Sequence, residues 1–131
     1  MIDKLALIYI RNNKILMTRS TGKSVWYIPG GKREPWESDE QTLVREIQEE
    51  LGVDIIVSSI QPYGVFSAQA HGKAEGIIVQ MTCYRADFTG TPTPEAEIEE
   101  LGWFDSTLSP DDMSPVDRII FADLKKKGLI G

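Results

Sequence analysis

Four glutamates at fixed spacing within residues 31–53 constrain this chain more than any other feature, in a stretch that reads GKREPWESDEQTLVREIQEELGV. They are Glu37, Glu46, Glu49 and Glu50. On an α-helix the last three are related by i, i+3 and i+4, so they form one stripe of carboxylates. Leu43, Ile47 and Leu51 form an apolar stripe beside it, which can pack on a core.

The predicted helix has recognisable ends. Ser38 suits the N-cap position, and Gln41 three residues later can complete a capping box. Gly52 follows the last apolar residue and suits a left-handed C′ position. The loop Pro29–Gly31 comes before, with a backbone that a ligand can approach closely. The sequence therefore predicts a glycine loop followed by a capped helix with one acidic face.

The acidic stripe has two interpretations. A solvated acidic helix face is common, and three carboxylates alone do not exclude it. Like charges at this spacing repel, however, and a divalent cation turns that repulsion into attraction, because hard cations such as Mg²⁺ prefer carboxylate oxygens.

The whole pattern decides between these interpretations. Gly31, then Glu37 six residues on, then Arg45-Glu46-Ile47 and Glu49-Glu50-Leu51-Gly52-Val53 fill every defining position of the Nudix box. The chain thus resembles the Nudix hydrolases. The resemblance implies an α+β fold, the Nudix α/β/α sandwich with a mixed β-sheet between helices. It also implies Mg²⁺ or Mn²⁺ as cofactor and, for residues 1–131, a single Nudix hydrolase domain.

The resemblance assigns roles to particular residues. The implied metal ligands are the Gly31 carbonyl, Glu46, Glu49, Glu50 and Glu97. Glu46 or Glu49 serves as the base for the attacking water, and Arg45 orients a carboxylate. Glu97 stands six residues before Trp103, the offset of a metal-holding acid in MutT-type members. Glu100 is a rival for that role, and a solvated charge remains the alternative for both.

Four further residues are candidates for substrate binding. Arg19 ends a predicted strand and either faces phosphate or is solvated there. Tyr27 either stacks on a nucleobase or packs at an edge. Lys32 follows the glycine loop, and His71 is the only histidine, in a polar turn. Trp36 stands where many family members have glycine, so the conformation of that loop is left open.

The implied reaction is hydrolysis of a phosphoanhydride in a nucleoside diphosphate linked to another group. The compact length favours a (deoxy)nucleoside triphosphate, split into nucleoside monophosphate and pyrophosphate. ADP-ribose, dinucleoside polyphosphates and nucleotide sugars stay open as substrates. A non-catalytic nucleotide-binding regulator of the same fold is the alternative from another class.

Charge, cysteine content and the lengths of the apolar runs limit the binding partners and the cellular compartment that we expect. The net charge of −6 disfavours binding of long nucleic acid through its phosphates. Cys83 is the only cysteine, so no internal disulfide is possible. The apolar run at the start is too short for a signal peptide, and no segment approaches the length of a membrane span. We therefore expect a cytoplasmic protein that binds a small nucleotide and no membrane; a homodimer stays open.

The remaining chain predicts a sheet and a second helix. Strands are expected as a hairpin over residues 4–19, then over 25–28, 54–59, 63–70 and 77–88, and in a segment ending at Phe104. The strands at 63–70 and 77–88 should pair as a hairpin closed by the His71 turn. Ser114 before Pro115 predicts the start of a helix that Gly128 ends.

Overall fold

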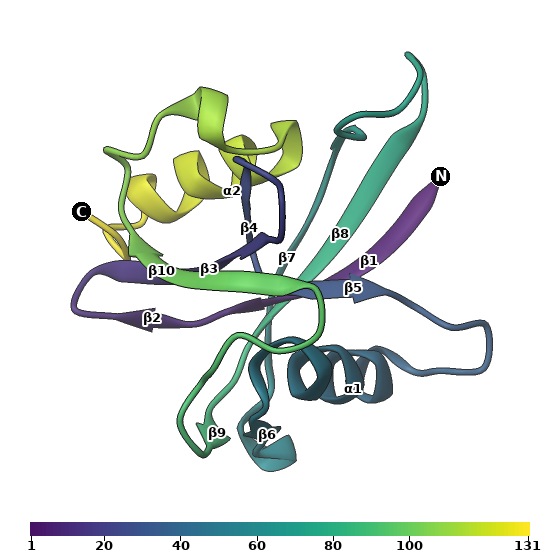
Figure 1. Ribbon diagram of the computed structural model, residues 1–131, viewed down its shortest axis with the longest axis vertical. Helices are drawn as coiled ribbons and strands as arrows, with labels where there is room; N and C mark the ends of the chain where they lie inside the picture. Colours follow the sequence, from purple (N-terminus) through teal and green to yellow (C-terminus); the bar gives the residue numbers. More distant parts are fainter.

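The computed structural model describes residues 1–131, with two helices and ten strands (Figure 1). The helices are α1 (Asp39–Leu51) and α2 (Pro115–Lys126). The strands are β1 (Ile2–Ile8), β2 (Ile10–Arg11), β3 (Lys14–Ser20), β4 (Trp26–Tyr27), β5 (Gly30–Lys32), β6 (Asp54–Ile55), β7 (Gln61–Gln69), β8 (Ile78–Arg85), β9 (Phe88–Thr89) and β10 (Ile98–Phe104). Short 3₁₀ turns lie at Val57–Ser59 and Pro110–Asp112.

The strands form two four-stranded sheets and one small pair. The first sheet has the order β5-β1-β8-β7, in which β1 and β8 run parallel and the other pairs antiparallel. The second has the order β10-β3-β2, with β4 beside β3, and β6 pairs with β9. Helices α1 and α2 lie on opposite sides of the sheets (Figure 1). The predicted α+β sandwich with mixed sheets is confirmed.

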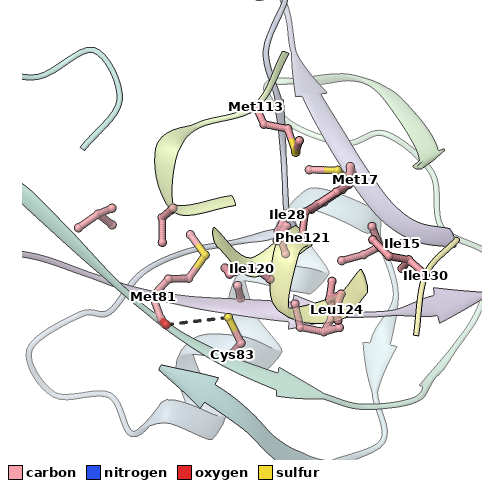
Figure 2. Close-up of a cluster of buried hydrophobic side chains, with 14 of the residues drawn as sticks. Ile15, Met17, Ile28, Met81, Cys83, Met113, Ile120, Phe121, Leu124 and Ile130 are labelled. Carbon is pink, nitrogen blue, oxygen red and sulfur yellow. Dashed lines mark hydrogen bonds between the residues drawn. The ribbon is translucent and has the colours of Figure 1, made fainter. Parts of the chain in front are cut away.

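Two hydrophobic clusters lie on opposite faces of the central strands. Alternate residues of β1 point to opposite faces, so Leu5 and Leu7 pack against α1, whereas Ala6 and Ile8 pack against α2. The same alternation occurs in β3, where Leu16 faces α1. Figure 2 shows the cluster on the α2 side, where Ile120 and Leu124 meet side chains of both sheets. Burial on both faces explains why β1 reads as a continuous apolar run.

Both predicted helix starts are confirmed. The Ser38 side chain accepts a hydrogen bond from the Gln41 amide, and the Gln41 side chain accepts one from the Ser38 amide. Gly52 ends α1 with a φ of 66°, in the left-handed region. Ser114 caps α2, with Pro115 at its first position. Local sequence signals thus fix where each helix begins.

Two strand predictions need correction. The segment 54–59 is a strand only over Asp54–Ile55, after which the chain turns into a 3₁₀ helix. The expected hairpin over 4–19 holds only from β2 to β3, around the turn Asn12–Asn13. β1 instead belongs to the other sheet, because its pairing with β8 and β5 competes successfully with the local partner.

The hairpin of β7 and β8 is confirmed as antiparallel. Its turn is held by the Gln69 side chain, which donates to the Ala74 carbonyl and accepts from the Gly76 amide. No helix of the protein is long and apolar enough to cross a membrane.

Candidate active site

The glycine loop lies directly against both a strand and the acidic face of α1. A Cβ atom at Gly30 would lie 1.9 Å from the Leu5 carbonyl oxygen, and the Gly30 φ of 148° also disfavours a side chain. A Cβ atom at Gly31 would lie 2.3 Å from the carboxyl carbon of Glu46. Glycine is therefore needed here for close approach, at Gly30 to backbone and at Gly31 to a predicted metal ligand.

Glu50 is the most deeply buried glutamate of the acidic stripe. Its Oε1 accepts a hydrogen bond of 2.9 Å from the Gly30 amide, which joins α1 to the glycine loop. Burial raises the pKa of Glu50 to about 8, and the charges of Glu46 and Glu97 act in the same direction. Burial also raises the pKa of Glu46, with Glu49 and Glu97 adding to it. These carboxylates therefore crowd one another, and the charges of Arg45 at Glu46 and of Lys4 at Glu50 oppose the rise in pKa only in part.

Arg45 organises the other end of the stripe. Its guanidinium binds Glu37 through two hydrogen bonds, of 2.7 Å from Nε and 2.8 Å from Nη2. Nη1 reaches Glu46 at 2.9 Å and Glu49 at 3.4 Å, and Nη2 also donates to the Lys32 carbonyl. The paired arginine lowers the pKa of Glu37 to about 2. Arg45 thus holds the glycine loop, the start of α1 and two of the predicted metal ligands in one arrangement.

Glu97 and Glu100 lie in different surroundings. Glu97 precedes β10, where its carbonyl accepts from the Thr21 amide, and its charge raises the pKa values of both Glu46 and Glu50. Glu100 instead pairs with Arg19 at 2.9 Å. The structure therefore brings Glu97, rather than its rival, to the acidic stripe.

No three acidic, histidine or cysteine side chains are gathered closely enough to enclose a metal ion as they stand. Glu46 and Glu49 turn toward Arg45, and Glu50 turns toward the Gly30 amide. The donors still fit a hard divalent cation, because they are carboxylate oxygens. Burial raises the pKa values of Glu46 and Glu50, and the charges of the neighbouring glutamates add to the effect.

A pocket of about 350 Å³ opens beside the acidic stripe; Glu50 of the stripe and Gly30 and Gly31 of the glycine loop line it. Its polar and charged lining otherwise consists of Lys4, Thr18, Ser20, Tyr27, Lys32, His71, Lys73 and Ser114. Three of the four predicted substrate-binding residues, Tyr27, Lys32 and His71, are among them. The rings of Tyr27 and His71 meet edge to face, with centroids 6.2 Å apart.

Arg19 does not line this pocket. Its guanidinium binds Glu99 and Glu100, donates to the Lys23 carbonyl at 2.9 Å and lies over the Trp26 ring. Four partners thus hold Arg19 in place. Trp36, whose role the sequence left open, is 78% exposed and does not line the pocket.

Sequence reasoning missed Lys4, which lines the pocket, and Asp117, which is buried next to the lining residue Ile28. Lys4 stands at the start of an apolar strand, where a lone lysine is easily taken for a solvated strand end. Asp117 lies in the first turn of α2 and is fully buried, although an acid there ordinarily indicates only a favourable interaction with the helix dipole. No local pattern could reveal either one, because their placement depends on packing between distant segments.

Comparison with known proteins agrees with this architecture. The NUDIX domain profile matches residues 2–124. The CTP pyrophosphohydrolase of Escherichia coli strain K12 is 36% identical over 96 residues, covering 70% of this chain and 67% of that protein. An 8-oxo-dGTP diphosphatase of Proteus vulgaris is 41% identical over 49 residues, covering 34% of this chain and 44% of that protein.

Among solved structures, the MutT NUDIX hydrolase from Burkholderia pseudomallei superimposes with a TM-score of 0.74 at 27% identity, covering 92% of this chain and 95% of that one. The profile match spans nearly the whole chain, and the acidic stripe, glycine loop and sandwich occur together in it. The chain therefore belongs to the Nudix family and is a Nudix pyrophosphohydrolase.

Proposed function

We propose that the protein hydrolyses a (deoxy)nucleoside triphosphate to a nucleoside monophosphate and pyrophosphate, with Mg²⁺ or Mn²⁺ as cofactor. The observation that carries the proposal is the junction at Gly30, Gly31 and Glu50, where the acidic stripe meets a pocket of about 350 Å³. A polyphosphate can then lie on the acidic stripe while the nucleoside occupies the pocket. Relatives named for CTP and 8-oxo-dGTP support the same class of substrate.

The residues that would hold the cation are Glu46, Glu49, Glu50 and Glu97, together with the Gly31 carbonyl. A bound divalent cation neutralises phosphate oxygens and makes water a stronger nucleophile. Glu46 or Glu49 takes the proton of the attacking water. The water oxygen forms a bond to phosphorus, the anhydride bond breaks, and pyrophosphate leaves.

The remaining site residues orient the metal-binding carboxylates or bind the substrate. Arg45 is a positioning residue, because it holds the Glu46 and Glu49 carboxylates and the Lys32 carbonyl without facing the pocket. Lys32 and His71 line the pocket and can neutralise phosphate charge next to the glycine loop. Tyr27 offers a half-buried ring for stacking.

A screen for released pyrophosphate and phosphate in Mg²⁺ tests the proposal. It should cover nucleoside triphosphates, oxidised ones included, and also ADP-ribose, dinucleoside polyphosphates and nucleotide sugars. The expected result is a triphosphate substrate whose turnover disappears in the Glu50→Gln variant and with excess chelator. Turnover of ADP-ribose or a nucleotide sugar alone would replace the proposed substrate. Retained nucleotide without turnover would favour a binding role.

A further inference from the structure

A single side chain organises the turn between β7 and β8, at the upper end of these strands in Figure 1. Gln69 Oε1 accepts a hydrogen bond of 2.9 Å from the Gly76 amide. Its Nε2 donates to the Ala74 carbonyl at 2.8 Å, and to the carbonyls of Ala70 and Lys73 at 3.3 and 3.4 Å. The Gln69 side chain thus contacts the backbone along the length of the turn.

Core packing contributes little to this turn, because residues 71–78 are all exposed. One backbone hydrogen bond closes the turn at its base, where the Ala70 amide donates to the Ile77 carbonyl at 2.8 Å. Two further backbone bonds within the turn are longer, at 3.2 and 3.3 Å. Exposed segments with few buried contacts open at a low cost in free energy. The conformation of the turn therefore depends largely on the Gln69 side chain.

The same turn forms one side of the pocket that we assign to the nucleoside. Ala70, His71 and Lys73 of the turn line the pocket, and so does Tyr27. The rings of His71 and Tyr27 meet edge to face, at a separation that is usual for aromatic pairs. Tyr27 belongs to β4 of the second sheet, whereas the turn extends from the first sheet. This aromatic contact therefore joins the two sheets beside the pocket.

We propose that Gln69 is a positioning residue for nucleotide binding, which holds the turn so that His71 stays against Tyr27 and completes the pocket. Gln69 does not line the pocket itself, so its influence reaches the nucleotide through the turn. This inference rests on the proposed function, because it takes the occupant of the pocket to be the nucleoside of a nucleotide. Loss of the Gln69 amide should weaken nucleotide binding and leave the acidic stripe of α1 undisturbed.

A double-mutant cycle tests the proposal. The affinities of CMP and dGMP are measured calorimetrically in Mg²⁺ for the wild type, Gln69→Leu, His71→Ala and the double variant. We expect each single variant to weaken the tighter-binding monophosphate about 3- to 10-fold, because groups that were held in place must then be ordered by the ligand. The double variant should bind within about 2-fold of His71→Ala, because Gln69 acts through the histidine.

Two further readouts separate positioning from a general loss of structure. In steady-state hydrolysis, Gln69→Leu should raise KM about 3- to 10-fold and leave kcat within about 2-fold, because it removes binding without touching the reacting groups. Gln69→Glu keeps an acceptor for the Gly76 amide and should restore part of the affinity. Gln61→Leu is the matched control, at an exposed position of the same strand outside the pocket, and should change neither affinity nor KM.

Several outcomes would overturn the inference. These are unchanged affinity in a folded Gln69→Leu protein, losses that multiply in the double variant, an equal loss in Gln61→Leu, or no binding of either monophosphate by the wild type. If thermal unfolding shows that Gln69→Leu does not fold, Gln69→Glu takes its place in the cycle. Coupled losses of affinity in a protein that releases no pyrophosphate would refute the proposed reaction and leave this inference standing. Pyrophosphate release with losses that multiply would do the reverse.

Discussion

The starts of the two helices place a carboxyl group in opposite electrostatic surroundings. At the start of α1, Glu37 meets a guanidinium through two hydrogen bonds, and the arginine beside it lowers its pKa to about 2. At the start of α2, Asp117 is fully buried, its Oδ2 accepts from the Ile28 backbone amide, and burial raises its pKa to about 7. Both helices are capped by serine. The guanidinium thus favours the charged form of the carboxyl in the first region, whereas burial favours the protonated form in the second.

The largest expected effect is at the acidic stripe of α1. Glu49→Gln and Glu50→Gln should each lower turnover at least about 100-fold, because each removes a charged ligand of the proposed metal site. Folding should be preserved, since glutamine at position 50 can still accept from the Gly30 amide. Steady-state kinetics and thermal unfolding check the two halves of the prediction. Undiminished turnover in both variants would remove the catalytic assignment.

The glycine loop offers a comparison within the first region. Gly31→Ala should lower turnover about 10-fold with little loss of stability, because its Cβ displaces the movable carboxylate of Glu46. Gly30→Ala should instead lower the free energy of unfolding by about 3 kcal/mol, because its Cβ meets the Leu5 carbonyl in the backbone of β1.

Chemical denaturation and kinetics on both alanine variants distinguish the two glycines. The interpretation requires that the stability loss at Gly30 exceed that at Gly31. If the two variants lose stability equally, Gly31 is needed for the fold of the loop and not for the approach of Glu46.

A smaller effect is expected at the acid that lies outside α1. Glu97→Gln should reduce turnover by about 3- to 10-fold and increase the Mg²⁺ concentration needed for half-maximal rate, because it contributes one charge to a site that three glutamates dominate. Glu100→Gln is the matched control, since its exposed side chain pairs with Arg19. A larger loss at Glu100 than at Glu97 would exchange their roles.

The sequence predicted those features that depend on residues close together in the chain, and it missed those that depend on contacts between distant segments. The caps of α1 and α2 and the acidic stripe depend on residues within one or two helical turns, and the structure confirms the helices that they define. The partner of Arg19, the sheet that β1 joins and the burial of Asp117 depend on segments distant in the chain. Spacing carries no information on such contacts. The glycine loop combines both cases. Its motif can be recognised in the sequence, but the close approach of the Glu46 carboxylate to Gly31 cannot.

The smallest expected effect concerns the pH dependence of stability, and it isolates the second region. The pKa of Asp117 is raised in the folded protein to about 7, whereas an unfolded aspartate titrates near about 3.9. Between these values the folded state binds more protons than the unfolded state. The contribution of Asp117 to stability is therefore complete below the lower pKa, falls as pH rises, and is lost above the higher one.

Asp117→Asn should remove this part of the pH dependence. Between pH 5 and pH 6.5 a single such group changes the free energy of unfolding by at most about 2 kcal/mol. Glu50, whose pKa burial raises to about 8, contributes to the same slope in both proteins, so only the difference between them reports on Asp117. Thermal unfolding across this range should show a melting temperature that declines less steeply with pH in the variant. Parallel profiles would mean that Asp117 is already charged at pH 5, with Lys4 compensating its burial more fully than the geometry suggests.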